Sequence, residues 1–209
     1  MKILRSKFEK KGCLARAFTL AEVVIGVTIL SIVLIGITTL TITSIRANEA
    51  NIHRLTAYYL AQEGLEGMRT IRDSNWLQNY TWNEGGKLWG IGFEQEGYYL
   101  IDYVPGSTVE PFKLTFLGTE EPSSEGVQLY LYWAGNDASH FYVQDKDASL
   151  SSWASEAEAS PYKRYLYVMY PNTAEDIAEV TAVVLWDEHG HSKSMRVSTR
   201  LSDWKEGPL

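Results

Sequence analysis

The chain has 209 residues, of which 45% are hydrophobic and 22% are charged, so it predicts one globular domain with a membrane anchor rather than two domains. Its single cysteine, Cys13, excludes an intramolecular disulfide. Removing residues 1–17, which carry six of the 19 basic and one of the 26 acidic residues, leaves a formal charge near −12, and such an acidic surface argues against a nucleic acid partner.

The first predicted element is the apolar run from Phe18 to Ile45, in which Glu22 is the single ionisable residue. As an α-helix with a rise of ~1.5 Å per residue, this run would be about 42 Å long, enough to cross a hydrocarbon core of about 30 Å. Its Thr-rich second part, residues 38–44, is the weakest helix former, and we expect its hydroxyls to bond back to backbone carbonyls. We predict a membrane-spanning helix over residues 18–45.

Basic residues are concentrated ahead of this run, at Lys2, Arg5, Lys7, Lys10, Lys11 and Arg16. This asymmetry predicts that the N-terminus faces the cytoplasm and that the rest of the chain is exported. An ordinary secretory signal would place an A-x-A-like cleavage site after its apolar region, whereas Ala15-Arg16-Ala17 lies before it. Residues 1–17 are therefore interpreted as a leader peptide of a different kind.

A basic leader, a small residue, then Phe18-Thr19-Leu20-Ala21-Glu22 and a long apolar run resembles the type III signal of type IV pilins and pseudopilins. The resemblance implies that a prepilin peptidase cuts between Ala17 and Phe18, and that the new amino group of Phe18 is N-methylated. The helix would then stay in the membrane until assembly. The family usually has glycine before the cut, where this chain has Ala17.

Glu22 is costly inside hydrocarbon, by about 2.5 kcal/mol or more, unless it finds a partner. In the family that the motif resembles, this glutamate pairs with the N-terminal amine of a neighbouring subunit and sets the stagger of the filament. The alternative is an ordinary membrane anchor in which Glu22 reaches the interface near the helix end.

Residues 46–74 are predicted to continue as an amphipathic stalk helix, with a stop near Asp73-Ser74-Asn75. Charged residues, among them Glu63, are expected on its other faces. The expected apolar stripe, which should carry the globular domain, consists of Ile52, Leu55, Tyr59, Ala61 or Gln62, Leu65 or Glu66, Met68 and Ile71.

Residues 75–209 read as a mainly β domain, because the apolar period changes to two. Strands are expected at residues 98–104, 112–117, 127–133, 141–144, 164–169, 179–186 and 194–201. The last two should form an antiparallel hairpin around Asp187–Gly190. The polar stretch 145–160 is expected to be an exposed loop.

No polar cluster predicts catalysis, and the sequence contains no nucleophile elbow, phosphate-binding loop or dinucleotide fingerprint. His189 and His191 are interpreted as exposed turn residues rather than zinc ligands. Oxygen ligands for calcium occur at Asn136, Asp137, Asp145 and Asp147, but their spacing does not fit an EF-hand. We expect no enzyme activity, no cofactor and no metal.

Tryptophans provide a test for ligand binding. An exposed, coplanar group of rings would favour a tip adhesin that stacks on sugars, whereas buried rings would belong to the core. The residues concerned are Trp76, Trp82, Trp89, Trp133 and Trp153.

Together these patterns predict an α+β fold, with a long N-terminal membrane and stalk helix packed on an antiparallel β-sheet, and the resemblance implies that this fold is pilin-like. The resemblance implies a structural minor pilin of a type IV pilus, and residues 61–72 look like those of minor pilins of the pilus modification protein type.

Its partners would be the membrane, other pilin subunits, the prepilin peptidase and the inner-membrane assembly platform. It would be a single-pass protein of the cytoplasmic membrane before assembly and part of a surface or periplasmic filament afterwards. The alternatives are a pseudopilin of a type II secretion or competence system, and an uncleaved, membrane-anchored extracytoplasmic binding domain.

Overall fold

The computed structural model describes residues 18–84, 92–103, 112–123, 126–133, 140–144, 158–171 and 176–203. Its first element, α1, is an α-helix from Leu20 to Leu77. The chain divides inside α1, between Glu49 and Ala50, into an N-terminal and a C-terminal unit. The C-terminal unit contains the rest of α1 and a curled antiparallel sheet, so the fold is α+β as predicted.

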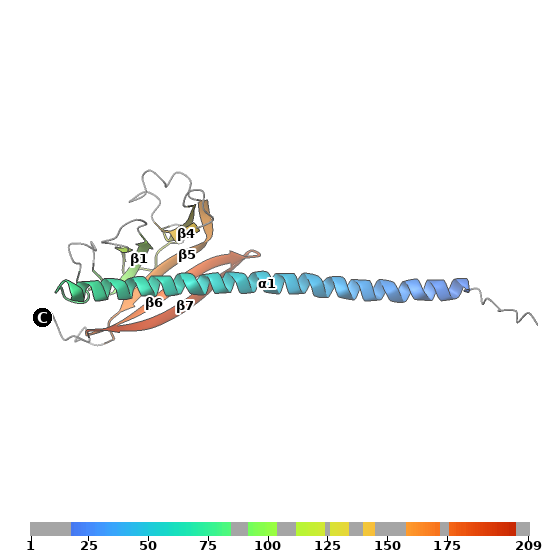
Figure 1. The fold of residues 1–209 in the computed structure, drawn as a ribbon, viewed down its shortest axis with the longest axis horizontal. Coiled ribbons are helices and arrows are strands. Elements are labelled where there is room, and N and C mark those ends of the chain that lie inside the picture. The colour runs from blue at the N-terminus through green and yellow to red at the C-terminus, as the bar shows by residue number, and fades with distance from the viewer. Residues whose placement is uncertain are drawn as a thin grey trace, which may run out of the picture. The chain divides into compact units, whose positions relative to one another are not determined.

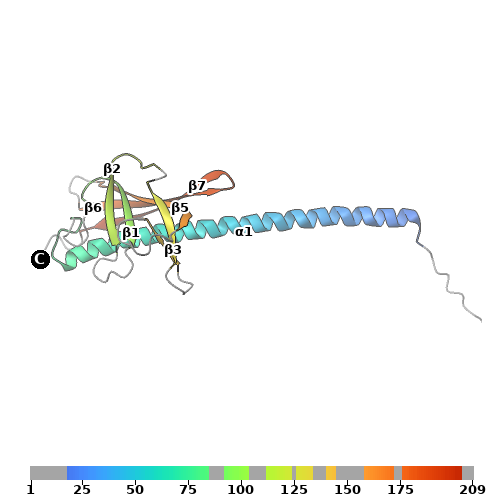
Figure 2. The same cartoon turned by 90° about the horizontal axis from the view of Figure 1, so that it is seen from above.

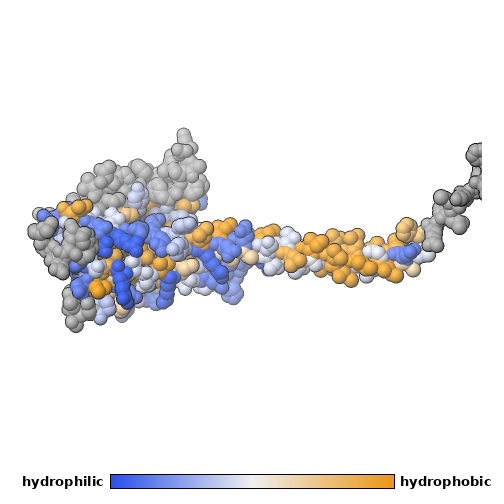
Figure 3. All heavy atoms as spheres, turned by 60° about the horizontal axis from the view of Figure 1, so that its bottom comes forward, coloured by the Kyte–Doolittle hydropathy of each residue, from blue (hydrophilic) through white to orange (hydrophobic). Residues whose placement is uncertain are grey.

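In the N-terminal unit, the helix expected over residues 18–45 is confirmed from Leu20 onward. Hydroxyl side chains from Thr28 to Thr43 donate hydrogen bonds of 2.8–2.9 Å to the carbonyl four residues earlier, as expected. In the part of the chain that the structure describes, α1 is the one helix long and apolar enough to cross a membrane, and none of its apolar window is buried by the protein. Its surface there is almost continuously apolar (Figure 3), so it suits a hydrocarbon environment.

In the C-terminal unit, the second half of α1 lies along one face of the sheet (Figures 1 and 2). The stalk helix is confirmed, but the predicted stripe is partly wrong, because Ile52, Leu55 and Tyr59 are 55–63% exposed. The buried face consists of Ala57, Leu60, Ala61, Gly64, Leu65, Gly67, Met68, Ile71, Asn75 and Trp76. The prediction considered large apolar residues and overlooked Gly64 and Gly67, where the sheet comes closest to the helix.

Gly67 marks the closest approach of α1 to the sheet. A Cβ at this position would lie 2.5 Å from Ile101 Cδ1 and 3.1 Å from Phe112 Cδ1. At Gly64 the nearest atom would be Leu166 Cδ2 at 3.2 Å. Small residues at these two positions let the helix backbone pack directly against the side chains of the sheet.

Gly67→Val should therefore destabilise the C-terminal unit. We expect the free energy of unfolding to fall by about 1–3 kcal/mol, the usual cost of adding methyl groups to a packed core. Urea denaturation followed by tryptophan fluorescence would measure the change. Glu66→Val is the matched control, because it places the same side chain on the exposed face of the same turn. Equal stability of the two variants would contradict close packing at Gly67.

The end of α1 differs slightly from the prediction, since the helix continues past Asp73–Asn75 to Leu77. Asn79 has a positive φ of 58° and its N–H bonds to the Trp76 carbonyl at 3.2 Å. The Tyr80 N–H bonds to the Asn75 carbonyl at 2.9 Å. These two bonds form a Schellman motif, in which asparagine takes the position usually held by glycine.

The described strands are β1 (Gly97–Tyr103), β2 (Phe112–Gly118), β3 (Gln128–Trp133), β4 (His140–Val143), β5 (Glu158–Met169), β6 (Ile177–Glu188) and β7 (His191–Ser202). All pairings among them are antiparallel. β5 is central: β6 pairs along one edge, and β1 and β3 pair with different parts of the other edge. β2 then pairs with β1, β4 with β3, and β7 with β6.

Two strand predictions need correction. β5 begins at Glu158, so residues 158–160 belong to a strand and not to the loop predicted over 145–160. The β6–β7 hairpin is confirmed, but its turn is shorter than predicted and consists of His189 and Gly190 alone. Both have positive φ, 51° and 78°, which is the requirement of a type I′ turn and matches the twist of the strands.

The two faces of the sheet differ. Alternate residues of β5, namely Tyr162, Arg164, Leu166 and Val168, are buried on the side of α1. On the opposite face Tyr165 and Val183 are buried with Val127, and Tyr98, Leu100 and Leu185 pack around them half-buried. The main core therefore lies between helix and sheet, and a smaller aromatic cluster lies on the outer face.

Candidate functional site

The start of α1 brings together the residues that the sequence motif singled out. Thr19 Oγ1 accepts a hydrogen bond from the Glu22 N–H at 3.2 Å, and the Thr19 N–H donates to Glu22 Oε2 at 3.2 Å. The Thr19 hydroxyl also donates to Glu22 Oε2 at 3.3 Å. These reciprocal bonds form a capping box, which satisfies two backbone donors at the start of the helix.

Glu22 thus has a local structural role that the sequence interpretation missed. The signal was present in Thr19-Leu20-Ala21-Glu22, because the pattern T-x-x-E ahead of an apolar run is typical of a capping box. The box fixes the carboxylate beside the positive end of the helix dipole. Among the described residues, Glu22 Oε1 accepts no hydrogen bond, so one oxygen is available to a partner.

The other two residues of the motif, Ala17 and Phe18, flank the expected cut. Phe18 precedes the helix, and its side chain is 84% exposed. Ala17, the small residue on the other side of the expected cut, lies outside the described residues. The structure therefore places Phe18 and Glu22 within one turn of the chain, with the ring exposed and the carboxylate capping the helix.

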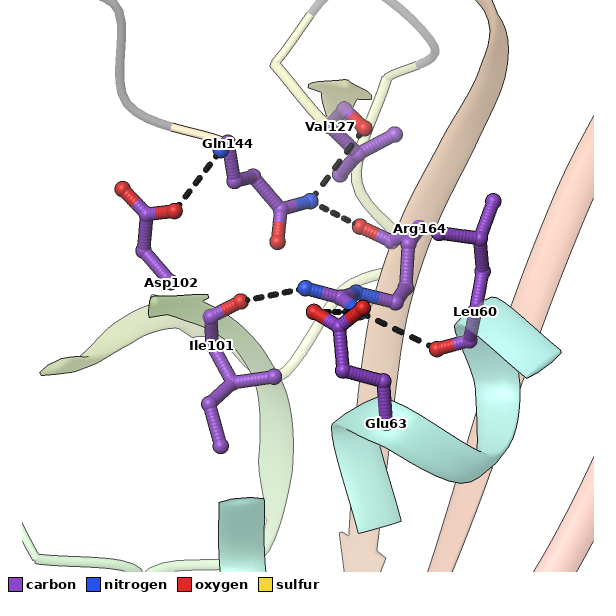
Figure 4. A network of polar contacts seen from close by, with 7 residues as sticks. All are labelled: Leu60, Glu63, Ile101, Asp102, Val127, Gln144 and Arg164. Atoms are coloured by element: carbon purple, nitrogen blue, oxygen red, sulfur yellow. Dashed lines mark hydrogen bonds and ion pairs between the residues drawn. The ribbon is translucent and has the colours of Figure 1, made fainter. Parts of the chain in front are cut away.

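A second polar site lies inside the C-terminal unit, around Arg164 of β5 (Figure 4). The Arg164 side chain is 1% exposed, and its Nη1 donates to the Leu60 carbonyl at 3.0 Å and to Glu63 Oε1 at 3.1 Å. Its Nη2 donates to the Ile101 carbonyl at 2.8 Å. One guanidinium therefore joins α1, β5 and β1. Glu63 was expected on another face of the stalk helix, but it points to the sheet and accepts a hydrogen bond from Arg164.

Gln144, just after β4, continues this network. Its Nε2 donates to the carbonyls of Val127 and Arg164, and its backbone N–H donates to Asp102 Oδ1 at 2.8 Å. β1 pairs with β5 as far as Leu166, and β3 pairs with β5 from Lys163, so Arg164 lies where the two pairings meet. The side chains of Arg164 and Gln144 supply hydrogen bonds at this seam in the sheet.

Among the five tryptophans considered as a possible sugar-stacking surface, the side chains of Trp76 and Trp82 are described, and both are buried. Trp76 and Trp82 are 5% and 3% exposed and belong to the main core, together with Trp186. Trp133 lies in β3, and Trp89 and Trp153 lie outside the described residues. The described rings therefore form part of the core and offer no exposed platform.

The histidine turn is exposed, as predicted, at both His189 and His191. Over the described ranges, no group of three or more His, Cys, Asp or Glu side chains is arranged to hold a metal ion. The four residues considered as calcium ligands, Asn136, Asp137, Asp145 and Asp147, fall outside these ranges.

No protein-family model, no curated protein and no solved structure matches this chain. The function must therefore be inferred from the chain's own residues. The parts of the chain with the clearest chemical requirement are the exposed apolar stretch of α1 and the Glu22 carboxylate, which caps this helix.

Proposed function

We propose that this chain is a structural, pilin-like subunit that is cut by a prepilin peptidase and assembled into a filament through its N-terminal helix. The observation that carries the proposal is the order of a basic leader, Ala17, Phe18, Glu22 and a long apolar run. The proposed roles are cleavage after Ala17, methylation at the Phe18 amine and intersubunit pairing through Glu22.

The exposed apolar surface of α1 supports this proposal, because such a surface must be shielded from water by lipid or by other helices. Its large side chains from Val23 to Ile45 are 46–72% exposed, and no other described residue shields them from water. Lipid would cover this surface before assembly, and the helices of other subunits would cover it in a filament. Gly26 and Gly36, which have open space around them, would allow such helices to approach closely.

We further propose that the filament is a type IV pilus in which this chain is a minor subunit. The expected partners are other pilin subunits, the peptidase, the membrane and an assembly platform in that membrane. A pseudopilin of a type II secretion or competence system has the same N-terminal requirement and is the second candidate. An uncleaved anchored domain is the third, and the Thr19–Glu22 capping box favours it to the extent that it gives Glu22 a role without a filament.

The mass of the N-terminal peptide, taken from protein in its native membranes, tests the proposal. We expect a peptide that begins at methylated Phe18. In an Ala17→Glu variant, a charged residue replaces the small one at the cut, and we expect the uncut peptide that begins at Met1. Cys13→Ala changes the leader away from the cut and should be processed normally. A wild-type peptide that begins at Met1 would mean an uncleaved anchor, and the filament proposal would have to be withdrawn.

A further inference from the structure

The outer face of the sheet, turned away from α1, contains an open groove of about 360 Å³. It is lined by Tyr98, Glu121, Tyr165, Tyr167, Thr181, Val183 and Arg196. Except for Glu121, which follows β2, these residues come from paired positions on β1, β5, β6 and β7. The groove is therefore built mainly on regular strands, and Glu121 joins it from the segment that follows β2.

Strand register explains why this face is hollow. Tyr98 lies opposite Tyr167, which lies opposite Thr181, so large rings on β1 and β5 meet a small side chain on β6. In the neighbouring row, Tyr165 lies opposite Val183, which lies opposite Arg196 of β7. Small residues on β6 thus form a floor between the tyrosines on one side and a long basic side chain on the other.

The tyrosine rings form one fixed cluster. The centroid of Tyr98 lies 5.6 Å from that of Tyr165 and 4.9 Å from that of Tyr167, with the rings tilted against one another. The Tyr165 side chain is buried, and its hydroxyl donates to Glu121 Oε1 at 2.5 Å. Burial and the neighbouring Glu121 carboxylate raise the pKa of Tyr165 and of Tyr98, so both phenols keep their protons at neutral pH.

Two groups of opposite charge line the groove together with these rings. Glu121 supplies a carboxylate, which is an acceptor, and Arg196 supplies a guanidinium with five N–H donors. Arg196 is exposed and makes no hydrogen bond or ion pair to any other residue that the structure describes. A ligand that binds its donors would therefore displace no partner among the described residues.

These charges restrict the class of ligand. Because a carboxylate and a guanidinium line the same small groove, an ion of either sign would be attracted by one and repelled by the other. A neutral ligand with many hydroxyls can use both, since each hydroxyl can donate to Glu121 or accept from Arg196. The tyrosine rings favour a ligand that also presents an apolar face.

We propose that this groove binds a neutral pyranose ring. Sugar hydroxyls would bond to Glu121 and Arg196, and the C–H face of the ring would pack against Tyr98 and Tyr167, which are half-buried and present ring surface to solvent. The volume lies at the lower end of the range for ligand sites, about 300–1,000 Å³, and suits one or two rings. This inference is independent of the proposed filament function, because the groove belongs wholly to the C-terminal unit.

The test uses the full chain in lipid nanodiscs and saturation-transfer NMR with methyl pyranosides of glucose, galactose, mannose and N-acetylglucosamine. We expect saturation of the ring C–H protons of at least one of them, with a millimolar Kd. Arg196→Ala should weaken that binding at least about tenfold, because it removes a charge-assisted hydrogen bond. Arg196 is exposed, so the variant should keep its fold, and thermal unfolding would verify this.

Arg200→Ala is the matched control. Arg200 lies on the same strand and the same face, but it pairs with Glu179 and does not line the groove. Sugar binding should be unchanged in this variant. Failure of all four pyranosides to bind at 50-fold molar excess would overturn the proposal, as would equal affinity of Arg196→Ala and wild-type protein. Preferential binding of methyl glucuronide or glucosamine would overturn the assignment to a neutral ring.

Discussion

Replacing Arg164 with leucine should lower the free energy of unfolding of the C-terminal unit by about 2–4 kcal/mol. Leucine keeps apolar atoms near the backbone of β5, but it is shorter than arginine and removes the donors that reach the carbonyls of Leu60 and Ile101 and the carboxylate of Glu63. Hydrogen bonds from charged groups contribute about 1.5–3 kcal/mol each, and buried carbonyls that lose a donor cannot turn to water. Urea denaturation of the full chain in nanodiscs would measure the effect, with the core residues Trp76, Trp82 and Trp186 as the fluorescence probe.

Two further variants separate the contribution of the carbonyl hydrogen bonds at the seam from that of the Arg164–Glu63 ion pair. Glu63→Gln removes the charge but leaves both carbonyls bonded, and because its side chain is 38% exposed we expect a loss of about 1 kcal/mol. Arg200→Leu removes an arginine whose side chain is 74% exposed, so its effect should stay within about 0.5 kcal/mol. If Arg164→Leu were as stable as Arg200→Leu, apolar packing alone would hold helix and sheet together.

The prediction from sequence succeeded where a local pattern determines the structure. A long apolar run can only be a helix in hydrocarbon, and the expected helix begins close to Phe18. The period of two in β6 and β7, interrupted by Gly190, predicted the hairpin, because alternate residues must face opposite sides of a sheet. In both cases the information lies within a few neighbouring residues.

The prediction failed where distant residues determine the structure. Arg164 lies on the same face of β5 as Leu166, which the period of two could have shown, but nothing nearby in the sequence indicated Glu63 as its partner, 101 residues earlier. The apolar stripe was only partly right for the same reason, since Gly64 and Gly67 belong to the buried face, where Leu166 and Ile101 approach them. The groove on the outer face likewise depends on the register of four strands, which single-strand patterns do not specify.

The Thr19–Glu22 capping box was missed although its signal is local, because the membrane and filament roles of Glu22 already accounted for the residue. The structure gives the same carboxylate a second explanation, as the N3 residue of a helix start. The two explanations make different demands on the side chain. Capping needs a hydrogen-bond acceptor at this position, which glutamine also supplies, whereas pairing with a charged amine needs the negative charge.

If this chain assembles as proposed, Glu22→Gln should leave the helix start intact and yet prevent assembly. We expect at least about tenfold fewer subunits in filaments, because a neutral amide in a low-dielectric environment loses most of its attraction for the protonated amine of a neighbouring Phe18. Thr19→Ala is the complementary variant, since it weakens the cap by about 1 kcal/mol but keeps the charge, and it should assemble at close to the wild-type level. Quantitative immunoblots of sheared filaments and of membranes, with N-terminal peptide masses from both, would measure incorporation and processing together.

The pattern of the two variants identifies the role of Glu22. Loss of assembly in Glu22→Gln alone would support pairing through the carboxylate, because the capping box is retained there. Equal loss in both variants would instead mean that the residue acts through the helix start, and the intersubunit role would be withdrawn. Normal incorporation of both variants would mean that assembly depends on neither the cap nor the charge, and the intersubunit role of Glu22 would again be withdrawn, leaving packing of the apolar surface of α1 against neighbouring helices as the basis of assembly.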